Sequence, residues 1–106
     1  MRMSRSPSSL SVELLLGRGY VVNVVERRIT PKISSDLFGC IDILALKGSE
    51  TLAVQASSRP NIAARTRKVV ESEHIDAMRE AGWTIEIHGW DEPTRGAFRV
   101  KTVDVS

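Results

Sequence analysis

The sequence contains one cysteine, two histidines and no long apolar run. A single cysteine excludes an internal disulfide, and Cys40, His74 and His88 are too far apart in the sequence to suggest a zinc site. No stretch approaches the roughly 20 apolar residues that a membrane-spanning helix needs. Glycine loops that cradle phosphates, nucleophile elbows and dinucleotide-binding fingerprints are also missing. We therefore expect a soluble, cytoplasmic protein that uses neither a membrane nor a small-molecule cofactor.

The chain has 106 residues, which suits one domain of ordinary size. Met1–Ser9 is basic and serine-rich, and no long apolar segment with a small-residue cleavage site follows it, so we predict a flexible arm followed by a single domain over 10–106. The net charge of +2 is too small to indicate a nucleic-acid partner by itself. Basic residues do gather in one segment, however: Arg59, Arg65, Arg67 and Lys68. This segment is either a patch that contacts phosphates or a solvated helix face.

Apolar periodicity and turn residues predict the order α-β-β-β-α-α-β-β. The predicted helices begin at Pro7-Ser8-Ser9, Ile62 and Ser72 and end at Gly17, Val70 and Ala81. The predicted strands are Tyr20–Arg27, Cys40–Lys47, Thr51–Ser57, Trp83–His88 and Phe98–Val105, with a loop at Ile29–Phe38. This order favours an α/β fold with a mixed sheet and flanking helices. The first three strands form an antiparallel meander, and the helical crossover lets the fourth strand join in another direction.

Two neighbouring strands carry polar residues where a core strand should be apolar. Asp42 interrupts the first of them, and Gln55 and Ser57 interrupt the second. Because strand side chains alternate between faces, an acid, an amide and a hydroxyl can converge on one patch. A buried carboxylate needs a partner, which is either a hydrogen bond from a nearby loop, such as Ser34 or Ser35, or a divalent metal.

Glu13 lies on the first predicted helix, one turn from both Leu10 and Leu16. We expect Leu10, Leu14 and Gly17 to mark the buried stripe of this helix, which puts Glu13 on its flank. From there Glu13 is either a solvated carboxylate or looks into a site at the edge of the core.

This arrangement resembles the PD-(D/E)XK nuclease superfamily, and within it the archaeal-type Holliday junction resolvases and the small phage and VRR-NUC-like nucleases. The first acidic motif is matched by Gly39-Cys40-Ile41-Asp42-Ile43-Leu44-Ala45, and Glu13 matches the glutamate of the first helix. Ser34 or Ser35 is similar in place to the loop serine of the resolvases. The second motif departs from the family, since Gln55 stands where an acid is usual and Ser57 where lysine is usual.

The resemblance implies a restriction-endonuclease-like fold and a Mg²⁺ site, with Mn²⁺ as a substitute. Asp42 would hold the metal, helped by the Gln55 side-chain oxygen, the Ala56 carbonyl and Glu13. Glu13, Asp42, Gln55 and Ser57 are the expected catalytic residues. Ser57 cannot supply the positive charge of the family's lysine, so Arg65 or Lys68 is a candidate replacement. Fewer carboxylates than usual imply weaker magnesium binding.

The expected function is a metal-dependent endonuclease that cuts branched DNA as a homodimer, with an interface at the final strand or at Leu37-Phe38. The expected DNA-binding residues are Ser34, Ser35, Arg59, Arg65, Arg67 and Lys68. One alternative is a DNA-binding module of the same fold with weak or no catalysis. The other is a structural protein-interaction domain that pairs through its last hairpin.

Overall fold

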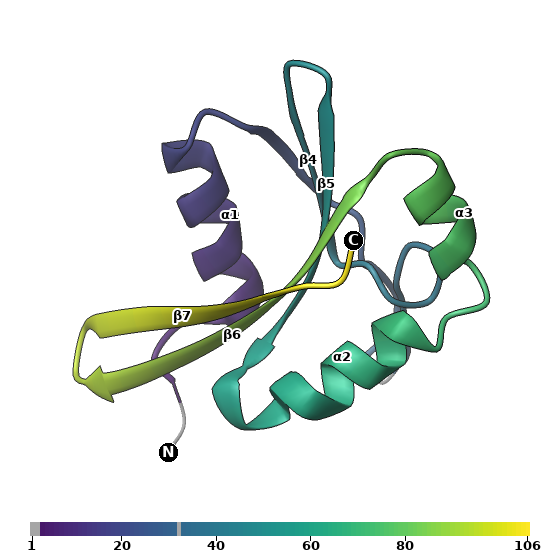
Figure 1. Ribbon diagram of the computed structural model, residues 1–106. Coiled ribbons are helices and arrows are strands. Elements are labelled where there is room, and N and C mark those ends of the chain that lie inside the picture. The colour runs from purple at the N-terminus through teal and green to yellow at the C-terminus, as the bar shows by residue number, and fades with distance from the viewer. Residues whose placement is uncertain (1–2, 32) are drawn as a thin grey trace.

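The computed structural model describes residues 3–31 and 33–106, without the side chains of Arg28, Ile33 and Ser34. A five-stranded sheet forms the middle layer, with helix α1 (Pro7–Gly17) on one face and helices α2 (Ile62–Val70) and α3 (Ile75–Glu80) on the other (Figure 1). The predicted α/β class is confirmed.

The strands of this sheet lie in the order β1-β4-β5-β6-β7. Their bounds are Val21–Val24, Ile43–Lys47, Glu50–Ser58, Thr84–Thr94 and Ala97–Asp104. β5 and β6 are parallel and the other neighbours are antiparallel, so the predicted meander and the change of direction after the crossover are both confirmed. The crossover consists of the short helix η1 (Arg59–Asn61), α2 and α3.

A small hairpin that was not predicted connects β1 to β4 along the chain. Its strands are β2 (Arg27–Thr30) and β3 (Ile33–Ser35), which pair antiparallel as a separate two-stranded sheet. The predicted strand Tyr20–Arg27 is therefore two strands with a break at Val25 and Glu26, and part of the predicted loop is ordered as β structure. The hairpin turns the chain back toward β4, and this reversal positions two of the acids described below.

Two apolar clusters pack on the two faces of the sheet. Leu15 of α1 packs against Ile43, Ala45, Leu52 and Val54 of β4 and β5. On the other face, residues of α2 and α3 pack against β5 and β6, with Cys40 buried among them. Asp42 and Gln55 are buried at the margin of this second face. The patch expected from strand alternation therefore lies on the side of the sheet that α2 covers.

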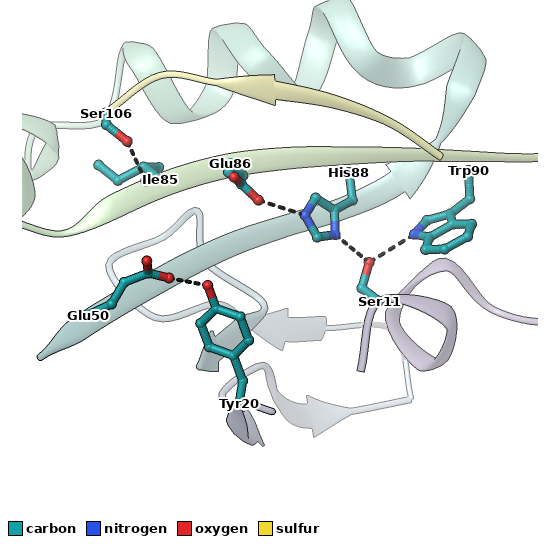
Figure 2. A network of polar contacts seen from close by, with 8 residues as sticks. All are labelled: Ser11, Tyr20, Glu50, Ile85, Glu86, His88, Trp90 and Ser106. Carbon is teal, nitrogen blue, oxygen red and sulfur yellow. Dashed lines mark hydrogen bonds and ion pairs between the residues drawn. The ribbon is translucent and has the colours of Figure 1, made fainter. Parts of the chain in front are cut away.

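Helix α1 is rotated relative to the predicted stripe. Its buried residues are Leu10, Ser11 and Leu15, while Leu16 is exposed. The hydroxyl of Ser11 is 2.9 Å from His88 Nδ1 and accepts a hydrogen bond from Trp90 Nε1 at 2.8 Å, so these contacts keep a serine at the centre of the buried face (Figure 2). His88 has no exposed surface.

The last two strands are longer than predicted. β6 continues past His88, where the predicted strand ends, as far as Thr94, and the reversal falls at Arg95 and Gly96. Gly89 lies within this strand, and a side chain at this position would overlap the Ile62 side chain at the start of α2. Glycine lets the helix approach β6 closely, so its function here is packing.

Helix α1 begins at Pro7, within the predicted start, with Ser6 as its N-cap, so residues 7–9 of the predicted arm belong to the helix. Ser4 donates hydrogen bonds from its N–H and hydroxyl to Glu92 on β6, and the Arg5 guanidinium lies 5.9 Å from the centre of the Phe98 ring. Residues 3–6 therefore run beside the β6–β7 hairpin. No helix in the described part of the chain is long and apolar enough to cross a membrane.

Candidate metal centre

Three carboxylates converge at the start of β4. One oxygen from each of Glu26, Asp36 and Asp42 lies within 4.8 Å of the others. Asp42 is buried, and Glu26 and Asp36 are half-buried. We call this set the acidic cluster. Carboxylate oxygens at this spacing are the donor type that Mg²⁺ and Mn²⁺ prefer.

Backbone hydrogen bonds hold two of these acids together. The N–H groups of Val25 and Glu26 both donate to the Asp42 carbonyl, at 2.8 and 3.2 Å. Val25 and Glu26, the two residues between β1 and β2, are therefore fixed against Asp42, the residue that precedes β4. Asp36 follows β3 and starts the turn through Phe38 and Gly39, both with positive φ, that returns the chain to Asp42.

The environment of Asp42 strongly disfavours its charge. Burial, and after it the nearby charges of Asp36 and Glu26, raise the pKa of this carboxyl from 3.8 to about 7. A hydrogen bond from the Ala56 N–H to Asp42 Oδ2, at 3.0 Å, and the charge of Lys68 act in the opposite direction. A bound cation would offset both unfavourable terms, which are desolvation and repulsion between like charges.

The residues of the second motif lie beside the cluster. Gln55 is buried, and its side-chain nitrogen donates to the Cys40 carbonyl at 2.6 Å, which fixes the amide. Both Gln55 and Ala56 line a cavity of about 210 Å³ together with the three acids. The Ser57 hydroxyl instead donates to the Ser58 carbonyl at 3.1 Å, and Ser57 does not line this cavity.

Two cations from α2 line the same cavity, which we call the acidic cavity. Lys68 Nζ is 2.8 Å from Asp36 Oδ2, and Arg65 contributes a second positive charge to the wall. Both were candidates for the charge that Ser57 cannot supply. Helix α2 thus brings a lysine to the acids, whereas Ser57 on β5 does not reach them.

Other predicted residues lie elsewhere. Glu13 is on the exposed side of α1, with 67% of its side chain accessible, and pairs with Arg5 at 2.5 Å. The physical reason is the rotation of α1: Glu13 is two residues from both Ser11 and Leu15, hence about 200° around the helix from each. The first helix therefore does not contribute its glutamate to the cluster.

The predicted DNA-binding residues divide into four groups. Arg65 and Lys68 line the acidic cavity, whereas Arg59 lies in η1, 4.0 Å from Asp91 Oδ1. Ser35 and Arg67 are exposed and do not line the acidic cavity. The side chain of Ser34 lies outside the part of the chain that the structure describes. Asp42 accepts its hydrogen bond from Ala56, rather than from Ser35 as one alternative proposed.

Sequence reasoning missed Glu26 and Asp36 because it missed the β2–β3 hairpin. A signal was present: the segment Arg27–Thr30 and Ile33 flank Pro31-Lys32, a turn-like pair between β-branched residues. The two acids immediately bracket that hairpin. Acids at the two ends of a hairpin are brought together when its strands pair.

No protein-family model, curated protein or solved structure matches this chain.

Proposed function

We propose that this chain is a metal-dependent endonuclease that hydrolyses phosphodiester bonds in DNA. The observation that carries the proposal is the convergence of Glu26, Asp36 and Asp42 in one cavity with Lys68 and Arg65. Carboxylates that hold a cation, next to side chains that attract a phosphate, are the groups that phosphodiester hydrolysis requires. The motif around Asp42 supports the same reading through its resemblance to PD-(D/E)XK nucleases, and we propose a restriction-endonuclease-like fold on that basis.

The donor set fits Mg²⁺ or Mn²⁺. All three acidic side chains offer oxygen, and the buried Asp42 carboxylate has a free-energy cost that a cation would remove. Asp42 would be the central ligand, Glu26 and Asp36 would complete the protein's contribution, and Gln55 could add a neutral oxygen. When bound, the metal supplies charge neutralisation of the phosphate and activation of water.

The chain's own residues then have separate tasks. The Ala56 N–H orients Asp42, and the Cys40 carbonyl orients the Gln55 amide. Lys68 holds Asp36 and presents its ammonium to a phosphate in the cavity. Arg65 has no ion pair or hydrogen bond with the described residues, so its guanidinium is available for a phosphate oxygen.

We propose branched DNA as the substrate, a cytoplasmic location and a homodimer. For the dimer, the exposed Phe38 beside the site and the edge strand β7 are the two surfaces to test. A two-fold dimer would place two sites on the two strands of a symmetric junction.

The test is cleavage of end-labelled four-way junction and linear duplex in Mg²⁺ and in Mn²⁺. Glu26→Gln and Glu13→Gln form a matched pair, because both remove one glutamate charge but only Glu26 belongs to the cluster. We expect Glu26→Gln and Asp42→Ala to lower cutting at least about 100-fold, and Glu13→Gln to leave it within about twofold.

Equal loss in both glutamate variants would contradict the assignment of Glu26. Junction binding without cutting in either metal, by wild type and Asp42→Ala alike, would support the inactive DNA-binding module instead. Absence of any DNA binding would favour the protein-interaction domain.

A further inference from the structure

A second cavity, of about 650 Å³, opens beside the acidic cavity. One wall is the N-terminal arm, residues 3–7, and the other is the end of β5 with the start of the crossover. Among the described residues that line it, the charged side chains are Arg5 and Arg65, and there is no carboxylate. Ser57, Ser58 and Asn61 add hydroxyl and amide groups. We call this space the arginine cavity.

The composition of the arginine cavity suits a phosphate. Arginine offers several N–H donors in a plane and remains charged, so it is the usual partner of phosphate oxygens. Arg65 lines both the acidic and the arginine cavity, which places one cation between the two. Arg5 pairs with Glu13, but both side chains are largely exposed. An exposed ion pair contributes little free energy, so this pair holds Arg5 only weakly.

A third cavity, of about 510 Å³, continues from the arginine cavity. Met3, Pro60, Trp90 and Pro93 give it apolar walls, and Arg59 lies at its side. We call it the apolar cavity. Its two acids already have partners: Asp91 accepts from Arg99, and Glu92 accepts from the N–H groups of Ser4 and Gly96.

The three cavities follow one another, because neighbours share lining residues. The acidic and arginine cavities share Pro7, Ala56 and Arg65, and the arginine and apolar cavities share Met3 and Ser58. The three cavities therefore form one groove. Its lining changes from candidate metal ligands to arginines suited to phosphate and then to apolar side chains. A nucleic-acid strand presents its groups in the same order, from a scissile phosphate to the next phosphate and the base beside it.

We infer that this groove binds DNA in single-stranded form, with one phosphate in the arginine cavity and an unpaired base in the apolar cavity. The inference rests on the proposed function, since the acidic cavity fixes where the scissile phosphate lies. A base enters a walled space only when it is unpaired, because a paired base is covered by its partner and its stacked neighbours. The preferred substrate therefore carries an unpaired nucleotide next to the scissile bond, as single strands, flaps and open branch points do.

Binding tests the groove without any cutting. The probe is a fluorescein-labelled oligothymidylate of about 12 nucleotides, compared with a duplex of the same length by anisotropy in EDTA. We expect the single strand to bind at least about tenfold tighter, and Arg65→Gln to weaken that binding about tenfold. Arg18→Gln is the matched control, because it also removes one arginine charge. Arg18 lies at the C-terminal end of α1, opposite the end that borders the cavities, and it lines none of the three.

Equal affinity for single strand and duplex would overturn the inference, and so would equal losses in Arg65→Gln and Arg18→Gln. Cleavage in Mn²⁺ then tests the apolar cavity. The substrates are a set of single-stranded oligonucleotides, each with one abasic site at a different position. We expect cutting to fall about tenfold when the abasic position is one nucleotide from the cut. Cutting that ignores the abasic position would overturn the base assignment.

The two proposals fail in different ways. Tight, Arg65-dependent binding of single strands with no cutting in either metal would refute the nuclease and leave the groove standing. Cutting of intact duplex that Asp42→Ala abolishes, with no preference for single strands, would refute the groove and leave the nuclease standing.

Discussion

Replacing Asp42 by asparagine should make the protein more stable and remove the proposed metal site. Asparagine is nearly isosteric and keeps an oxygen for the Ala56 N–H, while its amide nitrogen can donate toward Glu26 and Asp36. The substitution also removes the buried charge that the other two carboxylates repel. Activity and stability therefore respond in opposite directions at this residue.

The magnitude follows from the pKa of Asp42. Its value of about 7, against an ordinary 3.8, is equivalent to about 4 kcal/mol of destabilisation once the carboxyl is ionised. The sign follows from proton binding: between pH 4 and pH 7 the folded state holds a proton that the unfolded state has lost. Stability is thus highest below pH 4 for this group, falls as pH rises, and reaches its full deficit above pH 7. Because the acidic cavity admits water, about 4 kcal/mol is an upper limit.

The assay is thermal or urea unfolding of wild type and Asp42→Asn at pH 5 and pH 8, in EDTA. At pH 8 we expect the variant to be more stable by about 1 to 4 kcal/mol, which corresponds to a rise in Tm of at least about 4 °C. At pH 5 the two proteins should differ much less. Added Mn²⁺ should then raise the Tm of the wild type and leave that of the variant unchanged.

Asp104→Asn is the control. The hydroxyl and N–H of Ser106 lower the pKa of this exposed carboxyl, so its contribution is favourable above its ordinary pKa and is lost as pH falls through the lowered value. Its replacement should therefore give no stabilisation at pH 8. The reasoning about Asp42 is refuted if Asp42→Asn is less stable than wild type at pH 8, or if both asparagine variants change stability by the same amount.

Three further substitutions test the packing around the site by urea unfolding. Ser11→Ala should cost about 2 to 3 kcal/mol, because it removes the hydroxyl that bridges to His88 in a region with no exposed surface, and Ser11→Thr would have to restore part of the loss. Gly89→Ala should cost about 1 to 3 kcal/mol because its methyl group would overlap Ile62, and a second change, Ile62→Ala, should relieve part of that cost; strictly additive losses would contradict the steric cause. Thr66→Val should be neutral or stabilise by about 1 kcal/mol, since the Thr66 hydroxyl is buried without a partner among the described residues; a loss above 1 kcal/mol would show that the hydroxyl is bonded in solution.

The elements with regular apolar spacing were predictable from the sequence. Helix Ile62–Val70 has the predicted bounds, and the meander of β1, β4 and β5 follows from alternation and one tight turn. Alternation also placed Asp42 and Gln55 on the same face. These results depend on local periodicity, which the sequence displays directly.

The errors occur where a distant contact decides the outcome. Glu13 seemed to flank the buried stripe, but the hydrogen bonds of Ser11 to β6 set the rotation of α1, and no local pattern contains that information. Glu26 and Asp36 were missed because the residues between them form a hairpin that a polar, proline-containing segment conceals. Asp42, at the centre of the candidate site, was thus predictable from the sequence. Glu26 and Asp36 were not, because the β2–β3 hairpin determines their positions.

The single parallel pair in the sheet, β5 with β6, has a consequence for how the chain folds. The hairpins β4–β5 and β6–β7 close over short loops, whereas β5 meets β6 only after 25 intervening residues of crossover have been placed. Closing the longer loop is slower and costs more chain entropy. We therefore expect the two hairpins to gain hydrogen-exchange protection first during refolding and the β5–β6 amides last, and simultaneous protection would contradict this order. Asp42 and Gln55 lie at the β4–β5 hairpin, which we expect to form early, whereas Lys68 lies in the crossover. The acidic cavity is therefore completed only in the final step of folding.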